Sequence, residues 1–156
     1  MSFDKNINPM KLHHLVGDME ADYIYTPGVA GDKFFKALRD EGKLLATSCE
    51  TCKITYLPPR MYCERCFSEL DKWIEAESSG VVDSFTLVHE DRDGKKLPEP
   101  VLVAFIRIDN TDGGLIHKLG GVDLDAAKIG MTVKAVLKDK SKRTGGLTDI
   151  DHFAPE

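Results

Sequence analysis

Four cysteines carry the clearest chemistry in this sequence. Cys49 and Cys52 form one C-x2-C pair, and Cys63 and Cys66 form a second pair after a ten-residue gap. The two-residue spacing lets both thiolates of a pair curl around one ion, so two pairs on facing hairpins complete a tetrahedral shell of four sulfurs. Such a shell suits zinc and leaves no open position for water or substrate. We therefore expect these four residues to form a structural zinc site.

Other uses of the cysteines fit the pattern less well. Disulfides are disfavoured in a reducing compartment, and a bridge across two residues would be strained. A redox pair does not account for two matched pairs with no cysteine left over. Iron, as in rubredoxin, takes the same four thiolates, so the spacing alone leaves iron open as an alternative.

The two cysteine knuckles depart from the usual pattern in one respect. Glycine often follows the second cysteine of a pair, but Lys53 and Phe67 occupy these places. A positive φ there would cost a residue with a side chain more than it costs glycine. We therefore predict that the knuckle geometry is slightly relaxed.

The metal is also needed for the stability of the segment around it. Residues 46–73 are too few to bury a stable core unaided, whereas metal ligation supplies roughly 10–16 kcal/mol in small zinc peptides. Between the pairs, Leu57-Pro58-Pro59-Arg60 supplies a rigid bend. Trp73 follows, and its large apolar area is expected to bridge the ribbon to the rest of the chain.

Ahead of the ribbon, prolines and glycines interrupt residues 1 to about 30, and we expect an extended arm with one short helix. Within it, the adjacent His13 and His14 would point to different faces, which favours a surface position over metal ligation. A helix is predicted from Lys33 to Glu41, capped by Asp32. Its apolar side, with Phe34, Phe35 and Leu38, packs either on the chain's own ribbon or on a partner subunit.

After Trp73 the pattern changes to short strands. Alternating or apolar stretches predict strands at 81–89, 101–108, 115–119, 131–137 and 148–153. A polar segment at 123–128 predicts a single helical turn between the third and fourth strands. Five short strands with this helical turn are typical of a small Greek-key barrel of the OB type.

Composition limits the partners and the compartment. The formal net charge of -5 argues against a nucleic-acid binder, which would present a strongly basic face to phosphate. Residues 1–12 lack the apolar core of a signal peptide, and the longest apolar run, residues 101–106, is too short to cross a bilayer. We expect a cytoplasmic protein without a membrane segment.

Taken in order, these features resemble the zinc-ribbon/OB-fold family of small proteins that accompany thiolases and related acyl-CoA enzymes. The resemblance covers about residue 32 to the C-terminus, and its most specific element is the ribbon with the Pro-Pro-Arg bend. Further matching stretches are Gly42-Lys43-Leu44, Ser79-Gly80-Val81-Val82, Ser84-Phe85-Thr86 and Ile129-Gly130-Met131-Thr132-Val133. The missing knuckle glycines depart from the family pattern but remove no ligand.

Membership would imply a non-catalytic subunit that binds a thiolase-like catalytic partner in a hetero-oligomer and helps to form or gate its acyl-CoA site. Members occur in archaeal thiolase/hydroxymethylglutaryl-CoA synthase assemblies, in steroid side-chain aldolases and in the benzoylsuccinyl-CoA thiolase of anaerobic toluene degradation. The chain length and the N-terminal arm favour the small subunit of the last of these.

The expected fold is therefore mainly β. An N-terminal helical arm and helix would occupy residues 1–45, a rubredoxin-like four-cysteine zinc ribbon residues 46–75, and a five-stranded OB-fold barrel residues 76–156. An OB barrel and a zinc ribbon also recur in single-stranded nucleic-acid-binding proteins, which is the alternative function.

The chain is not expected to be an enzyme by itself. Acyl transfer needs an activated nucleophile, a base and oxyanion donors, yet all four thiols are assigned to metal and no Gly-x-Ser-x-Gly elbow exists. His89, His117 and His152 are isolated in sequence, which favours surface or capping roles.

Binding of coenzyme A with the partner is easier to support, because its phosphates attract arginine and lysine. The candidates are Arg60 and the loop residues Lys138, Lys140, Lys142 and Arg143. Solvation of the loop, and an ion pair of Arg60 with Glu64 or Glu69, are the simpler alternatives.

Overall fold

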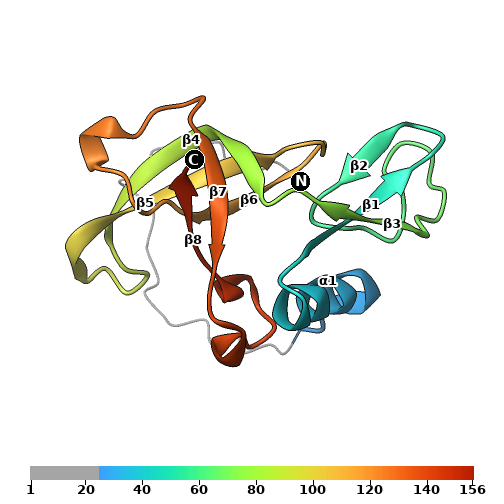
Figure 1. The fold of residues 1–156 in the computed structure, drawn as a ribbon, viewed down its shortest axis with the longest axis horizontal. Helices are drawn as coiled ribbons and strands as arrows, with labels where there is room; N and C mark the ends of the chain where they lie inside the picture. The colour runs from blue at the N-terminus through green and yellow to red at the C-terminus, as the bar shows by residue number, and fades with distance from the viewer. Residues whose placement is uncertain (1–24) are drawn as a thin grey trace, which may run out of the picture.

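The computed structural model describes residues 25–156, which form one α-helix, two antiparallel sheets and three short 3-10 helices (Figure 1). The predicted arm, with its short helix and with His13 and His14, lies almost wholly outside this range. Helix α1 spans Gly28–Asp40. The first sheet contains β1 (Leu44–Cys49), β2 (Ile54–Tyr56) and β3 (Lys72–Ala76); the second contains β4 (Ser79–Glu90), β5 (Lys96–Ile108), β6 (Gly114–Lys118), β7 (Thr132–Leu137) and β8 (Ile150–Pro155); the 3-10 helices are η2 (Leu124–Ala126), η3 (Lys140–Lys142) and η4 (Leu147–Asp149).

Helix α1 begins at Gly28 rather than at the predicted Lys33. Pro27 occupies the cap position without a side-chain cap, and the predicted cap, Asp32, lies inside the helix, where its carboxylate pairs with Lys36 at 2.7 Å. Gly31 is a helix breaker by residue type. In the structure its missing side chain lets the first turn close, because a Cβ there would lie 2.8 Å from Pro27 Cβ.

The apolar side of α1 packs on the chain's own core rather than on a partner. Phe34 is 2% exposed and Leu38 is fully buried, and Phe35 packs partly buried against the same residues. Of the two alternatives for this helix, internal packing is therefore correct.

The first sheet is the ribbon, with strand order β2-β1-β3. Central β1 pairs antiparallel with both neighbours, so that Thr47 stands opposite Tyr56 on one side and Trp73 on the other. Thr47 is fully buried, and its hydroxyl lies 3.0 Å from both the backbone nitrogen and the carbonyl oxygen of Arg60. That double contact fixes the Pro-Pro-Arg bend against the central strand.

The second sheet has the OB strand sequence, in the order β6-β5-β4-β7-β8, with η2 between β6 and β7 as predicted. It is not closed into the predicted barrel by a continuous ladder. The edge strands β6 and β8 meet through one parallel bridge, between Leu119 and Phe153, and through a hydrogen bond from Gly120 N to Phe153 O of 2.9 Å. The sheet is therefore open at its edges apart from this single parallel contact, whereas the sequence predicts a closed barrel.

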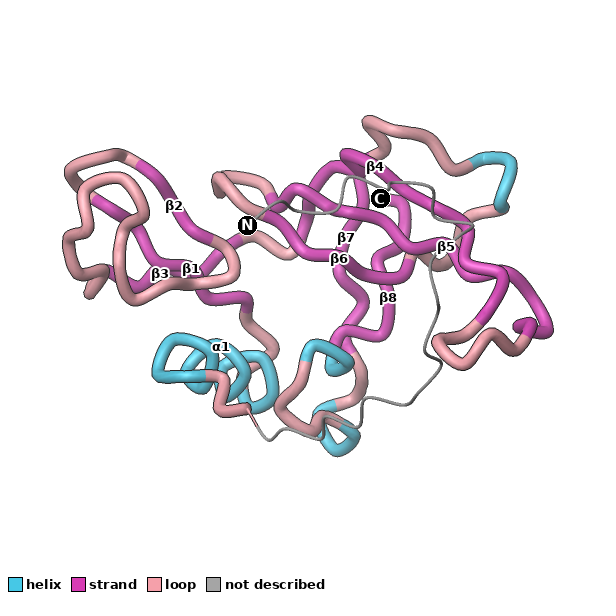
Figure 2. The backbone as a smooth tube through the Cα atoms, turned by 180° about the vertical axis from the view of Figure 1, so that it is seen from behind, coloured by secondary structure: helices cyan, strands magenta, loops and turns pink. Residues whose placement is uncertain are grey.

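One apolar core joins the helix, the ribbon and the OB sheet. Phe34 and Leu38 from α1 and Leu44 and Ala46 from β1 belong to the same buried cluster as the inward residues of β4 to β8. Figure 2 shows α1 beside the short 3-10 helices near β8, below the point where the ribbon leaves the OB sheet. The two sheets are therefore packed as one body through the helix.

A second joint ties the ribbon to the turn between β5 and β6. Thr55 N donates to Asp112 Oδ2 and Asp112 N donates to Thr55 O, each at 2.8 Å. Gly114 N donates to Leu57 O at 3.1 Å, and the backbone approaches so closely that a Cβ on Gly113 would lie 2.0 Å from Leu57 O. Backbone hydrogen bonds and an obligatory glycine thus connect the two sheets.

Trp73 does not make the bridge that its size suggested. It is half-buried in β3, and Lys33 Nζ of α1 lies 4.0 Å above its ring. The tryptophan therefore contacts the helix through a cation–π pair, and the bridge to the OB sheet is made by Leu57 and the turn at 112–114.

Replacing Gly113 by alanine should loosen the joint between the sheets. The new Cβ collides with a backbone carbonyl that cannot swing away, so we expect a loss of about 2 kcal/mol in the free energy of unfolding. Urea denaturation of the zinc-loaded protein measures this. Gly146→Ala is the matched control, because its nearest neighbour, Thr148 Oγ1, would lie at 3.6 Å. Equal stability of the two variants would contradict the close approach at Gly113.

Candidate metal centre

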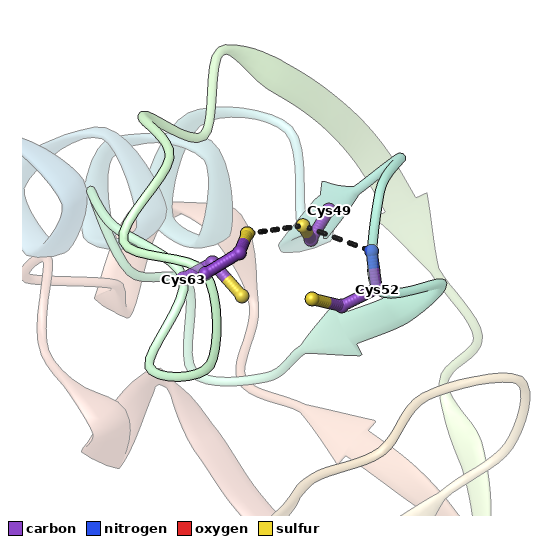
Figure 3. A group of neighbouring side chains, drawn as sticks. Cys49, Cys52 and Cys63 are labelled. Carbon is purple, nitrogen blue, oxygen red and sulfur yellow. Dashed lines mark hydrogen bonds between the residues drawn. The ribbon is translucent and has the colours of Figure 1, made fainter.

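The four cysteines are presented by two hairpins of the ribbon. Cys49 ends β1 and Cys52 lies in the turn that leads to β2. Cys63 and Cys66 lie in a second hairpin, residues 61–70, closed by hydrogen bonds from Cys63 N to Ser68 O at 2.9 Å and from Leu70 N to Met61 O at 2.8 Å. Figure 3 shows Cys49, Cys52 and Cys63 converging on the space between the hairpins.

The sulfur positions fit one tetrahedral ion. All four Sγ atoms lie within 4.8 Å of one another, and those of Cys49 and Cys66 are 3.6 Å apart. Zinc–sulfur bonds of about 2.3 Å would give a tetrahedron with edges of about 3.8 Å. Cys49, Cys52, Cys63 and Cys66 would therefore hold a zinc ion through four thiolates, with no coordination position left open.

The two knuckles have matching backbone geometry, and the predicted relaxation is wrong. Lys53 has φ 57° and Phe67 has φ 58°. Lys53 N donates to Cys49 O at 2.8 Å, and Phe67 N donates to Cys63 O at 3.0 Å. Each knuckle thus closes as a glycine-containing one would, although a left-handed conformation costs a residue with a side chain about 1–2 kcal/mol.

Little apolar material surrounds the site. The buried cluster around it contains Ile54, Tyr56 and Leu70 together with the sulfurs of Cys49 and Cys63. Cys52 and Cys66 lie toward solvent. So small a core cannot hold two hairpins in place unaided, which makes metal ligation the source of their stability.

Two hydroxyl groups donate to the sulfurs. Tyr56 Oη lies 3.3 Å from Cys63 Sγ, and Ser68 Oγ lies 3.1 Å from Cys66 Sγ. The bond from Tyr56 lowers the pKa of Cys63 to about 6 and raises the pKa of Tyr56 to about 12. The bond from Ser68 lowers the pKa of Cys66. Both donors stabilise thiolates, the form that binds metal.

The pKa of Cys52 shifts in the opposite direction from those of Cys63 and Cys66. Its hydrogen bond to Cys66 raises the pKa of Cys52 to about 12, since the Cys52 thiol acts as a donor to its neighbour. Without metal the cluster would therefore keep a proton at Cys52, and zinc must displace that proton to bind. The roles of Tyr56 and Ser68 were not predicted from the sequence, because a hydroxyl near a cysteine pair is recognisable only once the hairpin register is known.

Arg60 lies beside the metal site but is already paired. Its guanidinium forms an ion pair with Glu64 and lies 5.1 Å from the Tyr56 ring centroid. It lines a polar groove of about 270 Å³ together with Arg65 and Asp112, between the ribbon and the β5–β6 turn. The simpler alternative for Arg60, an ion pair with Glu64, is thus present.

The four basic loop residues divide into three groups. Arg143 is structural: Nε donates to Lys138 O at 2.8 Å, and the guanidinium packs against Gly42 at the end of α1. Lys138 and Lys142 line a hollow of about 290 Å³, whereas Lys140 stays exposed on η3. The structure therefore does not gather all four side chains around one ligand, and Arg60 lines a different hollow.

The fold places one further basic residue, which was not a candidate from the sequence, beside Lys138. Lys118 of β6 lines a hollow of about 300 Å³ with Lys138, Ile116 and Thr148. Within residues 25–156 neither lysine takes part in an ion pair within 4 Å, although Asp151 faces both. Lys118 and Lys138 lie twenty residues apart, so only the fold could reveal this pair.

The histidines are held in structural contacts or exposed. His117 Nε2 lies 3.3 Å from Leu147 O, and burial lowers the pKa of this imidazole. His152 Nδ1 pairs with Asp151 at 2.8 Å, and His89 is exposed on β4. Among the described residues none of the three adjoins the cysteine cluster as a fifth ligand.

Comparison with known proteins identifies a family. Residues 37–71 match the model of the rubredoxin-like zinc ribbon domain of ChsH2, and residues 73–138 match that of the ChsH2 C-terminal OB-fold domain. The ribbon match supports zinc over iron. No curated protein matches significantly. Within residues 25–156 no helix is both long and apolar enough to cross a membrane.

Two solved structures are similar over most of their length. A DUF35-family protein of unknown function from Sulfolobus solfataricus is 29% identical, with a TM-score of 0.63 over 83% of this chain and 87% of that one. The Ltp2-ChsH2(DUF35) aldolase is 24% identical, with a TM-score of 0.58 over 79% of this chain and 91% of that one, which is a likeness of fold. Nothing in these matches singles out the benzoylsuccinyl-CoA thiolase subunit, so that assignment stays a prediction.

Replacing Tyr56 by phenylalanine should weaken zinc binding. The hydrogen bond from Tyr56 lowers the pKa of Cys63 to about 6, so fewer protons compete with zinc for this sulfur at neutral pH. Without the Tyr56 hydroxyl the pKa rises, so zinc should leave at a higher pH and bind about tenfold more weakly at neutral pH. Competition with a chelating dye across a pH series measures both. Tyr62→Phe, which alters an exposed tyrosine of the second hairpin, should leave the curve unchanged.

Proposed function

Because the chain belongs to the family that joins a ChsH2-type zinc ribbon to an OB-fold domain, we propose that it is a non-catalytic accessory subunit of a thiolase-type acyl-CoA complex. It would bind the catalytic partner and help to form or gate the site for coenzyme A or acyl-CoA. The partner would contribute the reactive cysteine.

One observation carries this proposal: every cysteine of the sequence belongs to a single four-thiolate cluster. Four-thiolate coordination leaves neither a nucleophilic thiol nor an open metal position. The three histidines within residues 25–156 are engaged or exposed, as described above. A chain built in this way is suited to holding surfaces in a fixed relation rather than to turnover.

The rigidity of the chain supports an adaptor role. Helix α1, the ribbon and the OB sheet share one core, and the turn at 112–114 hydrogen-bonds to the ribbon at a second place. Two separate attachments prevent the ribbon from pivoting. Surfaces on both sheets could thus engage a partner at once without an entropic cost for ordering them.

A structural neighbour suggests the class of the partner. That neighbour is an aldolase in which ChsH2, a DUF35 protein, is combined with Ltp2. Transfer of this arrangement to the present chain is a proposal, and it agrees with the resemblance of the sequence to subunits that accompany thiolases. We place the chain in the cytoplasm for the same reason.

Coenzyme A contacts are proposed for the basic residues around the loop before β8. Lys138 and Lys142 line one hollow of about 290 Å³. Lys138 and Lys118 line a second hollow of about 300 Å³. A diphosphate or a 3′-phosphate would find the ammonium groups of Lys118 and Lys138 there without an ion pair to the described residues, whereas Lys142 would first give up its exposed pair with Asp139. Arg60 would contribute only at the separate groove beside the ribbon, after giving up its pair with Glu64. Lys140 and Arg143 would act by shaping the loop.

Native co-purification tests the proposed function. The tagged chain, expressed in its own host, should recover a thiolase-type protein in a fixed ratio, identified by mass spectrometry and sized by native gel filtration. The purified complex should turn over a thioester, and the chain alone should not. Recovery of the chain by itself, thioester cleavage by the isolated chain, or tight salt-sensitive binding of single-stranded oligonucleotides would each contradict the proposal.

Charge reversal tests the coenzyme A contacts. In the purified complex, Lys138→Glu and Lys142→Glu should each weaken coenzyme A binding about tenfold or more, because each removes a charge-assisted contact and adds a repulsive carboxylate. Isothermal titration measures the affinity. Lys128→Glu is the matched control, since Lys128 is exposed between η2 and β7 and lines neither hollow. Unchanged affinity in both loop variants would remove these residues from the proposed site.

A further inference from the structure

Phe67 combines two unfavourable features at the tip of the second knuckle. Its backbone has φ 58°, where glycine would be relaxed, and its ring is 79% exposed to solvent. Lys53 has the same kind of backbone at the first knuckle, with φ 57°, but a lysine side chain is well hydrated there. At Phe67 alone among the described residues a left-handed backbone coincides with a large exposed apolar side chain.

Other exposed apolar residues differ from Phe67 in this respect. Ile116 is 66% exposed and Ile129 is 67% exposed, yet neither has a positive φ. Isolated exposed residues of that kind are common on protein surfaces. Within residues 25–156 the Phe67 ring makes no aromatic or cation–π contact that would offset its exposure, so any gain from the ring must come from outside the chain.

The neighbours of Phe67 have the composition of an interface. Tyr62 is 60% exposed on the same hairpin, paired across it with Glu69. Arg65 is exposed and, among the described side chains, has no ion pair, unlike nearby Glu64, which pairs with Arg60. Tyrosine, phenylalanine and arginine are enriched in the contact centres of protein interfaces, and lone aromatics there enter pockets of the partner.

The metal site would hold this group of side chains in place. Phe67 follows the ligand Cys66, and its backbone nitrogen donates to the oxygen of the ligand Cys63 at 3.0 Å. The ring is thus carried on a backbone fixed by ligation, so little entropy is lost when it binds. A preorganised aromatic next to an unpaired guanidinium suits an apolar pocket with a carboxylate at its rim.

We propose that Phe67, flanked by Tyr62 and Arg65 on the 61–70 hairpin, is the anchor that docks the chain to its catalytic partner, entering an apolar pocket bordered by a carboxylate. This inference rests on the proposed function and identifies the surface that the partner binds. The left-handed backbone at Phe67 is then explained, because the interface gains from a side chain that the knuckle itself does not need.

The test uses the thiolase-type subunit recovered with the chain and then purified separately. Its affinity for the zinc-loaded chain is measured by isothermal titration for the wild type, Phe67→Gly and Phe67→Asn, since glycine and asparagine both tolerate a positive φ. Both variants should bind at least tenfold more weakly while retaining one zinc per chain. Phe67→Tyr should restore binding to within about threefold of the wild type.

Lys53→Gly is the matched control. It makes the same backbone change at the equivalent place of the other knuckle, so it should leave the affinity within about twofold of the wild type. Wild-type affinity in both Phe67→Gly and Phe67→Asn, or equal weakening by Lys53→Gly, would overturn the anchor. Those outcomes are distinct from failure of the proposed function, in which the wild-type chain forms no complex with a thiolase-type protein.

Discussion

The convergence of four thiolates on one point is the constraint from which the rest of the structure follows. Two hairpins with a small buried cluster of their own must place Cys49, Cys52, Cys63 and Cys66 at the corners of one tetrahedron. Hydrophobic burial in a unit of this size is too small to do so. Metal ligation supplies the missing free energy and tolerates a left-handed backbone at both knuckles. Hydroxyl donors from Tyr56 and Ser68 then favour the thiolate forms of Cys63 and Cys66.

Rigidity at the metal is passed to the rest of the chain by two routes. Strand β1 leads from α1 into the first knuckle and contributes Leu44 and Ala46 to the common core. The strand on the other side of that knuckle, β2, leads to Leu57, which meets the β5–β6 turn in backbone contact at Gly113. Because both strands of the first hairpin are anchored, the metal-fixed tips keep a constant position relative to the OB sheet. The proposed adaptor role, in which two surfaces are aligned on a partner, depends on this property.

The parts of the fold that rest on local pattern are predicted by the sequence. Cysteine spacing predicts the cluster, and alternation predicts all five OB strands and the turn at η2. Local pattern does not predict the features that depend on contacts between distant segments. Trp73 has the size of a bridge, but its register in β3 turns it toward α1, and the bridge is made by Gly113, whose role depends on how closely Leu57 approaches. Asp32 has the chemistry of a helix cap, but Gly31 lets the helix begin five residues earlier, at Gly28. Closure of the OB sheet likewise depends on how β6 and β8 meet, which no local pattern specifies.

Amide hydrogen exchange before and after zinc removal tests the central claim most directly. If the tetrathiolate site holds the two cysteine hairpins and their joint, removing zinc with a chelator should abolish protection across residues 49–70 and at the 112–114 turn. Protection in β4, β5 and β7 should largely remain, because their packing is supplied by the main core. Unchanged exchange across residues 49–70 in a chain shown to be free of metal would contradict the account.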